Sequence, residues 1–202
     1  MLSGKPIIDK LQLDTDLEIE TAKLIERFNL QLHPEGGYYA RFFKSSSTVK
    51  PTDKIRYNNE DRSAGTSIYY LLKANDFSAW HRLKSDEIWH FYKGSPIKIH
   101  IINKQGTLST HLLGDNITNP EASFQIAITA GDWFAAELID KSSYSFVGCT
   151  VTPGFDFQDF ELADRIALTN HFPKHSSIIS RLTRSKKPEI SLSTGTRIYS
   201  KL

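Results

Sequence analysis

Residues 79–94 read Ala-Trp-His-Arg-Leu-Lys-Ser-Asp-Glu-Ile-Trp-His-Phe-Tyr-Lys-Gly, and this stretch decides the fold. Apolar and polar residues alternate on either side of a short polar turn, which predicts two consecutive β-strands. Because successive side chains of a strand face opposite sides, a small β-barrel would direct His81 and Glu87 into its interior. The stretch therefore predicts a β-fold with ionisable groups in its core.

Similar short strands are expected along most of the chain. They are Tyr38–Phe43, Thr66–Leu72, Ser78–Leu83, Glu87–Lys93, Ile97–Asn103, Leu108–Leu113, Phe124–Ile128, Trp133–Leu138 and Tyr144–Val151. Turns rich in Gly, Asn and Asp separate many of them, and the polar residues 44–65 are expected to form a long loop. Many short strands at nearly regular spacing predict an antiparallel barrel or sandwich.

Helices are predicted only towards the two ends of the chain. The first would begin at Asp14, Thr15 or Asp16 and run to about Phe28, with apolar residues recurring at helical spacing. Two more are predicted at Phe160–Phe172 and His175–Leu182. The expected organisation is a flexible leader at 1–14, a single domain with flanking helices at 15–184, and a basic, disordered tail at 185–202.

Composition and charge limit the classes of function. Hydrophobic residues make up 39% of the 202 residues, which is typical of a globular protein with a sizeable core. The formal net charge of +2 is too small to indicate a specific nucleic-acid partner. The charge is uneven, because residues 174–202 hold seven Lys or Arg residues and one Glu. We therefore expect a mildly acidic body with a solvated basic tail.

The single cysteine and the lack of long apolar runs narrow the setting of the protein. One cysteine allows neither an intrachain disulfide nor a cysteine-based zinc site. Cys149 lies in an apolar run and is expected to be a core residue rather than a nucleophile. The N-terminus has no apolar signal region, and no run approaches the length of a membrane span. A cytoplasmic protein with no membrane partner is expected.

Five segments, in order along the chain, resemble a known family. They are Leu32-His-Pro-Glu-Gly-Gly-Tyr-Tyr39, Thr66-Ser-Ile-Tyr-Tyr-Leu-Leu72, Ser78-Ala-Trp-His-Arg-Leu-Lys-Ser-Asp-Glu-Ile-Trp-His-Phe-Tyr92, Ala130-Gly-Asp-Trp-Phe-Ala-Ala-Glu137 and Val147-Gly-Cys-Thr-Val-Thr-Pro-Gly-Phe-Asp-Phe-Gln-Asp-Phe160. The series resembles the cupin superfamily, and specifically the uncharacterised Cupin_5 family, over roughly residues 17–184. The resemblance implies a mainly β fold, the cupin double-stranded β-helix or jelly-roll barrel, with N- and C-terminal α-helices. It also implies a homodimer with a small-molecule ligand at the barrel mouth.

The metal-binding motifs of general cupins are incomplete in this chain. His81, Glu87 and Gly94 match the first motif, but Leu83 replaces its second histidine. In the second motif Gly131 is kept, while spacing puts Glu137 at the proline position and Ser142 at the histidine position. His81 and Glu87 alone are too few ligands for a catalytic zinc or iron site.

His90 would complete such a triad only through a β-bulge, because strand alternation directs it away from Glu87. No metal or other cofactor is expected. A metal-dependent cupin enzyme is the third hypothesis for this chain.

The first hypothesis is a metal-independent isomerase or epimerase acting on a carbohydrate-like or nucleotide-sugar compound. The chain is similar to metal-free cupins that epimerise keto-deoxy sugar nucleotides, which implies that His81 is the general base and Glu87 orients it. The acid tyrosine of those enzymes would lie near Thr150–Thr152, where this chain has none. Tyr38, Tyr70 or Tyr144 would have to replace it. The alternative for His81 is a structural hydrogen bond to Glu87 inside the core.

Other polar residues are candidates for ligand contacts. In the segment 33–38 the glycines permit close approach of a ligand, although the same glycines also suit a plain turn into the barrel. The segment 153–159 would close the barrel mouth or simply connect a strand to a helix. The predicted ligand-binding residues are Glu35, Gly37, Tyr38, Tyr70, His90, Glu137 and Asp156. The second hypothesis is that the same pocket serves a non-catalytic binding or sensing module.

Overall fold

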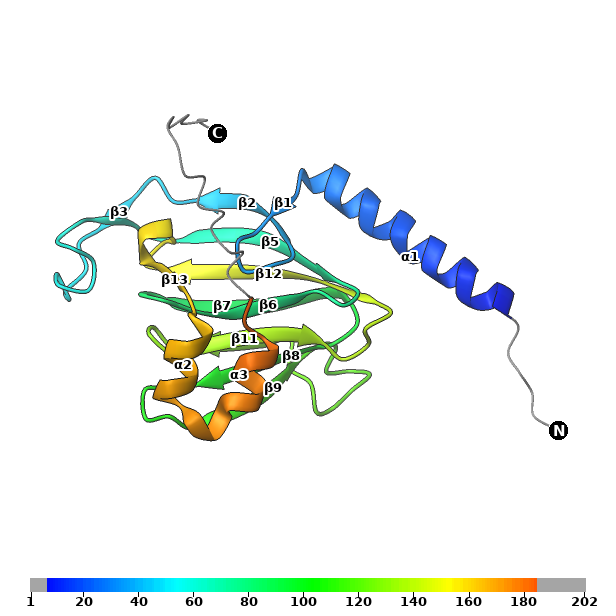
Figure 1. The fold of residues 1–202 in the computed structure, drawn as a ribbon. Helices are drawn as coiled ribbons and strands as arrows, with labels where there is room; N and C mark the ends of the chain where they lie inside the picture. Colours follow the sequence, from blue (N-terminus) through cyan, green and yellow to red (C-terminus); the bar gives the residue numbers. More distant parts are fainter. Residues whose placement is uncertain (1–6, 185–202) are drawn as a thin grey trace, which may run out of the picture.

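The computed structural model describes residues 7–184, with side chains from Asp16 onward. Two antiparallel sheets pack face to face as a jelly roll, which confirms the predicted mainly β fold (Figure 1). One sheet has the order β1-β2-β5-β12-β7-β10, the other β13-β6-β11-β8-β9, and β3-β4 form a separate ribbon. The strands are β1 Gln31–Leu32, β2 Tyr38–Lys44, β3 Thr48–Val49, β4 Arg62–Ser63, β5 Thr66–Lys73, β6 Phe77–Leu83, β7 Asp86–Gly94, β8 Ile97–Ile102, β9 Leu108–Leu113, β10 Gln125–Ile128, β11 Trp133–Leu138, β12 Tyr144–Thr152 and β13 Phe160–Leu162.

The main core fills the space between the two sheets. Alternate residues of β7 face inward as predicted: Glu87 and Trp89 are buried, and Phe91 packs against the same cluster. From the opposite sheet, β11 contributes Phe134 and Ala136 to this cluster. Alternation along each strand therefore places one set of side chains between the sheets and the other set outside.

Helix α1, Ile7–Phe28, packs on the outer face of the six-stranded sheet towards its C-terminal end, and its N-terminal part projects beyond the strands (Figure 1). Leu24 and Phe28 pack there against Leu71 and Phe146, so the predicted apolar face of the helix is confirmed. The helix begins before the expected start and extends into the predicted leader, because the chain has neither Gly nor Pro between Ile7 and Phe28. The rest of that leader, residues 1–6, and the predicted tail, 185–202, lie outside the described residues.

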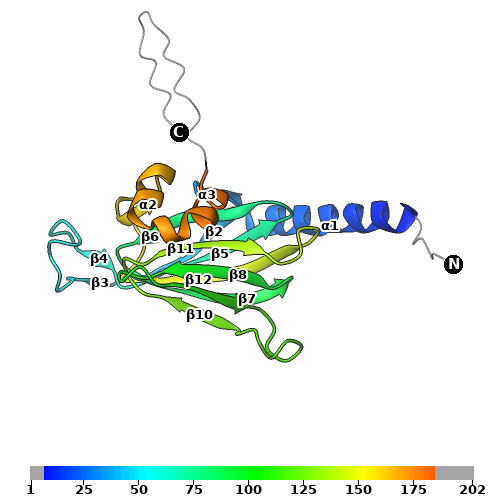
Figure 2. The same cartoon turned by 60° about the horizontal axis from the view of Figure 1, so that its bottom comes forward.

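The C-terminal elements cover the outer face of the other sheet (Figure 2). The predicted helix at Phe160–Phe172 is wrong at its start, because residues Phe160–Leu162 form β13 and pair with β6. Asp164 then caps α2, Arg165–His171, by accepting hydrogen bonds from two backbone N–H groups. A 3₁₀ turn, η2 (Pro173–His175), leads into α3, Ser176–Arg181, which lies close to the helix predicted at His175–Leu182.

The predicted loop 44–65 contains the β3–β4 ribbon and is tied to the barrel by a buried ion pair. Arg62 donates from Nε to Asp159 Oδ2 at 2.6 Å and from Nη2 to Oδ1 at 3.0 Å. Asp159 belongs to η1, Phe157–Asp159, which follows β12. The pair therefore fixes both the loop and η1 at one end of the barrel.

No helix within residues 7–184 is long and apolar enough to cross a membrane.

Candidate functional site

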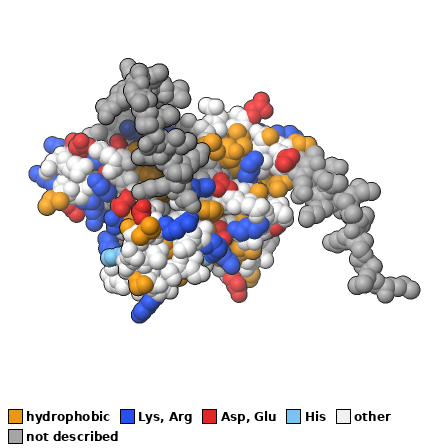
Figure 3. Space-filling model, in the orientation of Figure 1, with side chains coloured by type: hydrophobic (Ala, Val, Ile, Leu, Met, Phe, Trp, Pro, Cys, Tyr) orange, Lys and Arg blue, Asp and Glu red, His pale blue; other side chains and the backbone are white. Residues whose placement is uncertain are grey.

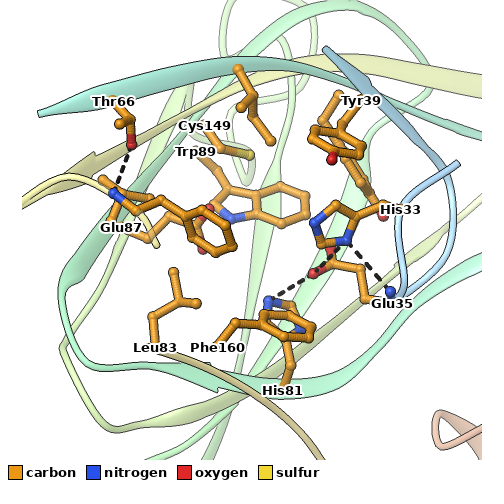
Figure 4. Close-up of a pocket in the computed structure, with 14 residues that line it drawn as sticks. His33, Glu35, Tyr39, Thr66, His81, Leu83, Glu87, Trp89, Cys149 and Phe160 are labelled. Carbon is orange, nitrogen blue, oxygen red and sulfur yellow. Dashed lines mark hydrogen bonds and ion pairs between the residues drawn. The ribbon is translucent and has the colours of Figure 1, made fainter. Parts of the chain in front are cut away.

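A cavity lies between the two sheets, at the barrel end where β6 finishes and β7 begins (Figure 4). Its volume, measured as the space open to the centre of a water-sized sphere, is about 40 Å³. That is room for about three waters, or for one end of a larger ligand. The residues whose side chains define it are His33, Glu35, Tyr39, Thr66, Ile68, Tyr70, His81, Leu83, Glu87, Trp89, Cys149, Val151, Phe155 and Phe160.

The turn between β1 and β2 carries Glu35 into this cavity. Gly37 adopts φ +68° and donates its N–H to Asp76 Oδ2 at 2.8 Å. Tyr70 donates its hydroxyl to the carbonyl of Gly36 at 2.8 Å. From the far end of the described chain, Arg184 donates to the carbonyl of Glu35 at 2.9 Å. Three separate contacts thus hold the backbone around Glu35.

Gly37→Ala is expected to destabilise the protein by roughly 2 kcal/mol. A Cβ at this position would lie 2.8 Å from both the carbonyl oxygen of Leu71 and the hydroxyl of Tyr70, in a backbone conformation that suits glycine. Urea denaturation of the variant measures the loss, with Gly65→Ala as a control, because a Cβ there meets nothing closer than 3.7 Å. Equal stability of the two variants would contradict the prediction.

The carboxylate of Glu35 is the centre of the polar network. Oε1 accepts a hydrogen bond from Ser78 Oγ at 2.8 Å. Oε2 lies 3.1 Å from Nε2 of His81 and 3.3 Å from Nδ1 of His33 (Figure 4). Burial by itself raises the pKa of Glu35, but the two histidines and Ser78 outweigh it and lower the pKa to about 2. Glu35 is therefore ionised at neutral pH.

His81 has no free ring nitrogen. Its Nδ1 lies 2.7 Å from the carbonyl oxygen of Ala79, and its Nε2 faces Glu35. Burial lowers the pKa of His81, whereas the Glu35 carboxylate opposes that effect. Because both nitrogens face acceptors, the hydrogen bonds are complete only when both carry protons. Among its carboxylate contacts, the partner of His81 is Glu35 rather than the predicted Glu87.

His33 is the histidine with a nitrogen to spare. Its Nδ1 lies 3.3 Å from the ionised carboxylate of Glu35 and 3.4 Å from the backbone N–H of the same residue. The carboxylate is a charged group that can only accept, and it is the nearer contact, so we assign a proton to Nδ1. Nε2 has no hydrogen-bond partner within the described residues, and the ring lies beside Tyr39 at the cavity wall (Figure 4). The side chain is 7% exposed. His33 and Tyr39 were not predicted as site residues. The sequence signal for His33 was its position two residues before Glu35, within the same turn.

Glu87 lies in the same cavity in the opposite protonation state. Its Oε2 is buried without a hydrogen-bond partner among residues 7–184. Burial raises the pKa of Glu87 to about 8, and the charge of Glu35 adds to the rise. The carboxyl is therefore protonated at neutral pH. The neighbouring Cys149 is also neutral, because burial raises its pKa well above the usual value.

Only some of the predicted ligand contacts reach the cavity. Glu35 and Tyr70 line it, and Gly37 shapes the turn beside it. Tyr38 does not, because β2 alternates: Tyr39 faces the cavity, while Tyr38 packs in the outer cluster under α1 and lies beneath the ammonium group of Lys73.

Three other predicted contacts lie elsewhere. His90 lies on the face of β7 that points away from the core, and its Nε2 forms a hydrogen bond with Oγ1 of Thr150 at 3.1 Å. Glu137 faces outward on β11, where it contacts His100, Lys141 and Arg181. Asp156 caps η1 by accepting from the N–H of Gln158 and lines a groove outside the cavity.

The donor set does not fit the metal of general cupins. Leu83 presents an apolar side chain to the cavity at the position of the second histidine. Ser142 lies in an exposed turn bonded to Asp140, and β12 presents Cys149 and Val151 instead. Within the described range, no three His, Cys, Asp or Glu side chains are grouped to hold a metal ion.

Comparisons place these residues in a known fold. The family model described as Cupin_5, cupin superfamily (DUF985), matches residues 22–163. A Shewanella oneidensis protein of known crystal structure is 32% identical, with 81% of this chain and 97% of that one aligned at a TM-score of 0.72. A hypothetical protein from Leishmania major is 30% identical, with 81% and 98% aligned and the same TM-score. No curated protein matches the chain.

Proposed function

The chain belongs to the Cupin_5 family of the cupin superfamily, whose barrel supports small-molecule binding, and from this premise we propose a metal-independent isomerase or epimerase. Its substrate would be a carbohydrate-like compound with a carbonyl group, nucleotide sugars included. The cavity admits only one end of such a molecule, so the carbonyl end would enter and the remainder would lie outside.

One observation carries the proposal: two buried carboxyls line the same cavity with opposite protonation states. The pKa of Glu35 is lowered to about 2, and that of Glu87 is raised to about 8. Pairs of titratable groups whose environments separate their pKa values are typical of sites that combine acid and base chemistry.

The proposed step moves two protons: one leaves the carbon beside the carbonyl, and one reaches the carbonyl oxygen. Nε2 of His33 takes a proton from the carbon beside the carbonyl, and the electron pair of that C–H bond forms a C=C bond. The carbonyl π pair takes the proton of Glu87, which yields an enediol when the deprotonated carbon bears a hydroxyl group. For an isomer, His33 returns its proton to the other carbon; for an epimer, a solvent proton adds to the opposite face and His33 releases its proton to solvent. In both cases the Glu87 carboxylate takes back a hydroxyl proton as the carbonyl reforms. Glu35 stabilises the imidazolium of His33, and His81 positions Glu35.

His33→Gln is expected to slow proton exchange roughly 100-fold, because a positioned general base contributes at least that factor. The measurement is deuterium incorporation from D₂O, followed by NMR, into a panel of ketose phosphates and nucleotide sugars. His111→Gln, an exposed position on β9, is the control and should leave the rate unchanged. His81→Gln should shift the pH profile of the rate, because it replaces a titratable partner of Glu35 by one that does not titrate.

Exchange at the wild-type rate in His33→Gln would remove His33 from the role of base. No exchange by the wild-type protein on any compound of the panel would contradict the isomerase proposal for those compounds.

A second candidate function is binding without turnover. The observation that favours it is that His81, Ser78 and Tyr70 already have hydrogen-bond partners inside the protein, as in a structural network. Saturable binding of a compound that incorporates no deuterium would favour this candidate. The homodimer and the cytoplasmic location stay predictions.

A further inference from the structure

A wider groove adjoins the cavity at the barrel mouth. Tyr39, Thr66, Ile68 and Phe155 line both hollows, so the two share a wall. The centre of a water molecule can occupy about 400 Å³ of the groove, against about 40 Å³ of the cavity. A ligand too large for the cavity therefore has room to continue into the groove.

A β-bulge turns two basic side chains into this groove. On β2, Arg41 pairs with Ile68 of β5, but Phe43 pairs with the next residue, Ser67, so one extra residue is inserted. Regular alternation would place Arg41 and Lys44 on opposite faces of the strand. The extra residue restores them to one face, and both line the groove.

Arg41 and Lys44 outnumber the acidic residue that lines the groove with them. Neither Arg41 nor Lys44 forms an ion pair with any residue of the described chain, 7–184. Asp156 is the acidic residue lining the groove, and its Oδ1 accepts the N–H of Gln158 at 3.1 Å. Lys and Arg side chains lie at this end of the molecule beside the β3–β4 ribbon, interspersed with Asp and Glu (Figure 3). The groove therefore offers positive charge to a ligand.

We propose that Arg41 and Lys44 bind a phosphate group of the ligand whose carbonyl end enters the cavity. The assignment of the carbonyl end rests on the proposed function; the phosphate site does not. A phosphate suits the site because its several oxygens can accept from the planar guanidinium and from the ammonium group together. The substrate class narrows accordingly to phosphorylated sugars and nucleotide sugars.

The test is a titration of the full chain with inorganic phosphate, followed by amide shifts in ¹H–¹⁵N NMR spectra. Saturable shifts are expected at the amides of residues 41–44 and 155–157. Arg41→Ala and Lys44→Ala should each weaken binding about tenfold, as expected for loss of one charge-assisted hydrogen bond. Lys98→Ala, an exposed charge on β8, is the matched control and should not change the affinity.

Two results would overturn the inference: no saturable shift in the groove, or equal phosphate affinity in the wild type and the Arg41→Ala, Lys44→Ala double variant. Acetate that binds more tightly than phosphate would overturn the assignment to phosphate. Phosphate binding without deuterium exchange would contradict the isomerase proposal and support the phosphate site in the groove. Deuterium exchange without phosphate binding would support the isomerase proposal and contradict the phosphate site.

Discussion

Glu87→Gln is expected to make the folded protein more stable than the wild type at pH 9, by about 5 kcal/mol. The pKa of Glu87 is about 8 in the folded protein, against 4.5 for an ordinary glutamate. Each unit of such a shift corresponds to about 1.4 kcal/mol. Because the folded pKa is the higher one, the wild type loses stability as pH rises from about 4.5 through about 8. A glutamine has no proton to lose and escapes this loss.

The measurement is the free energy of unfolding in urea for both proteins between pH 4 and pH 9. The two curves should nearly coincide at pH 4 and separate steadily above it. Glu121→Gln, at an exposed position, is the control and should run parallel to the wild type. Parallel curves for Glu87→Gln as well would mean that Glu87 is ionised in the folded protein, and Glu87 could not then act as the acid.

Arg62→Ala is expected to destabilise the protein by about 3–5 kcal/mol, the usual cost of removing one partner from a buried ion pair. The side chains of Arg62 and Asp159 are each 3% exposed, and they are joined by two hydrogen bonds. Without the guanidinium, Lys84 at 3.5 Å would be the one cation left beside the carboxylate of Asp159 within residues 7–184. The stability of Arg62→Lys should lie between those of the wild type and Arg62→Ala, because an ammonium group keeps the charge but cannot reproduce the planar fork of the guanidinium.

Urea denaturation at pH 7 measures this effect. Arg82→Ala is the matched control, because Arg82 pairs with Glu161 at the surface and such pairs contribute about 1 kcal/mol or less. If Arg62→Ala cost no more than Arg82→Ala, the buried pair would not be what fixes η1 and the ribbon.

Local patterns were enough to predict the strands, since each strand carries its own alternation. The inward direction of Glu87, Trp89 and Phe91 followed from residue order alone and is confirmed. A single-residue shift, by contrast, was enough to select Tyr38 where Tyr39 faces the cavity. At Phe160–Leu162, helical spacing was overruled by pairing with β6, a contact between residues about eighty positions apart.

The candidate site could be predicted only in part, because its contacts join distant segments. The approach of Glu35 to His81 depends on how the β1–β2 turn folds over the barrel, and spacing within either segment does not contain that information. Counting along the second motif led to Ser142, since the count took no account of the exposed turn between β11 and β12. The raised pKa of Glu87 likewise depends on burial by several strands.

The hydrogen bond from Arg184 to the carbonyl of Glu35 has a consequence for synthesis on the ribosome. The two residues are 149 positions apart, and Arg184 is the last residue that the structure describes. The chain is made from its N-terminus, so the turn that carries Glu35 emerges long before the residue that clamps it. A nascent chain therefore completes this turn only after Arg184 has left the ribosome, and a truncated product ending before Arg184 would lack this hydrogen bond.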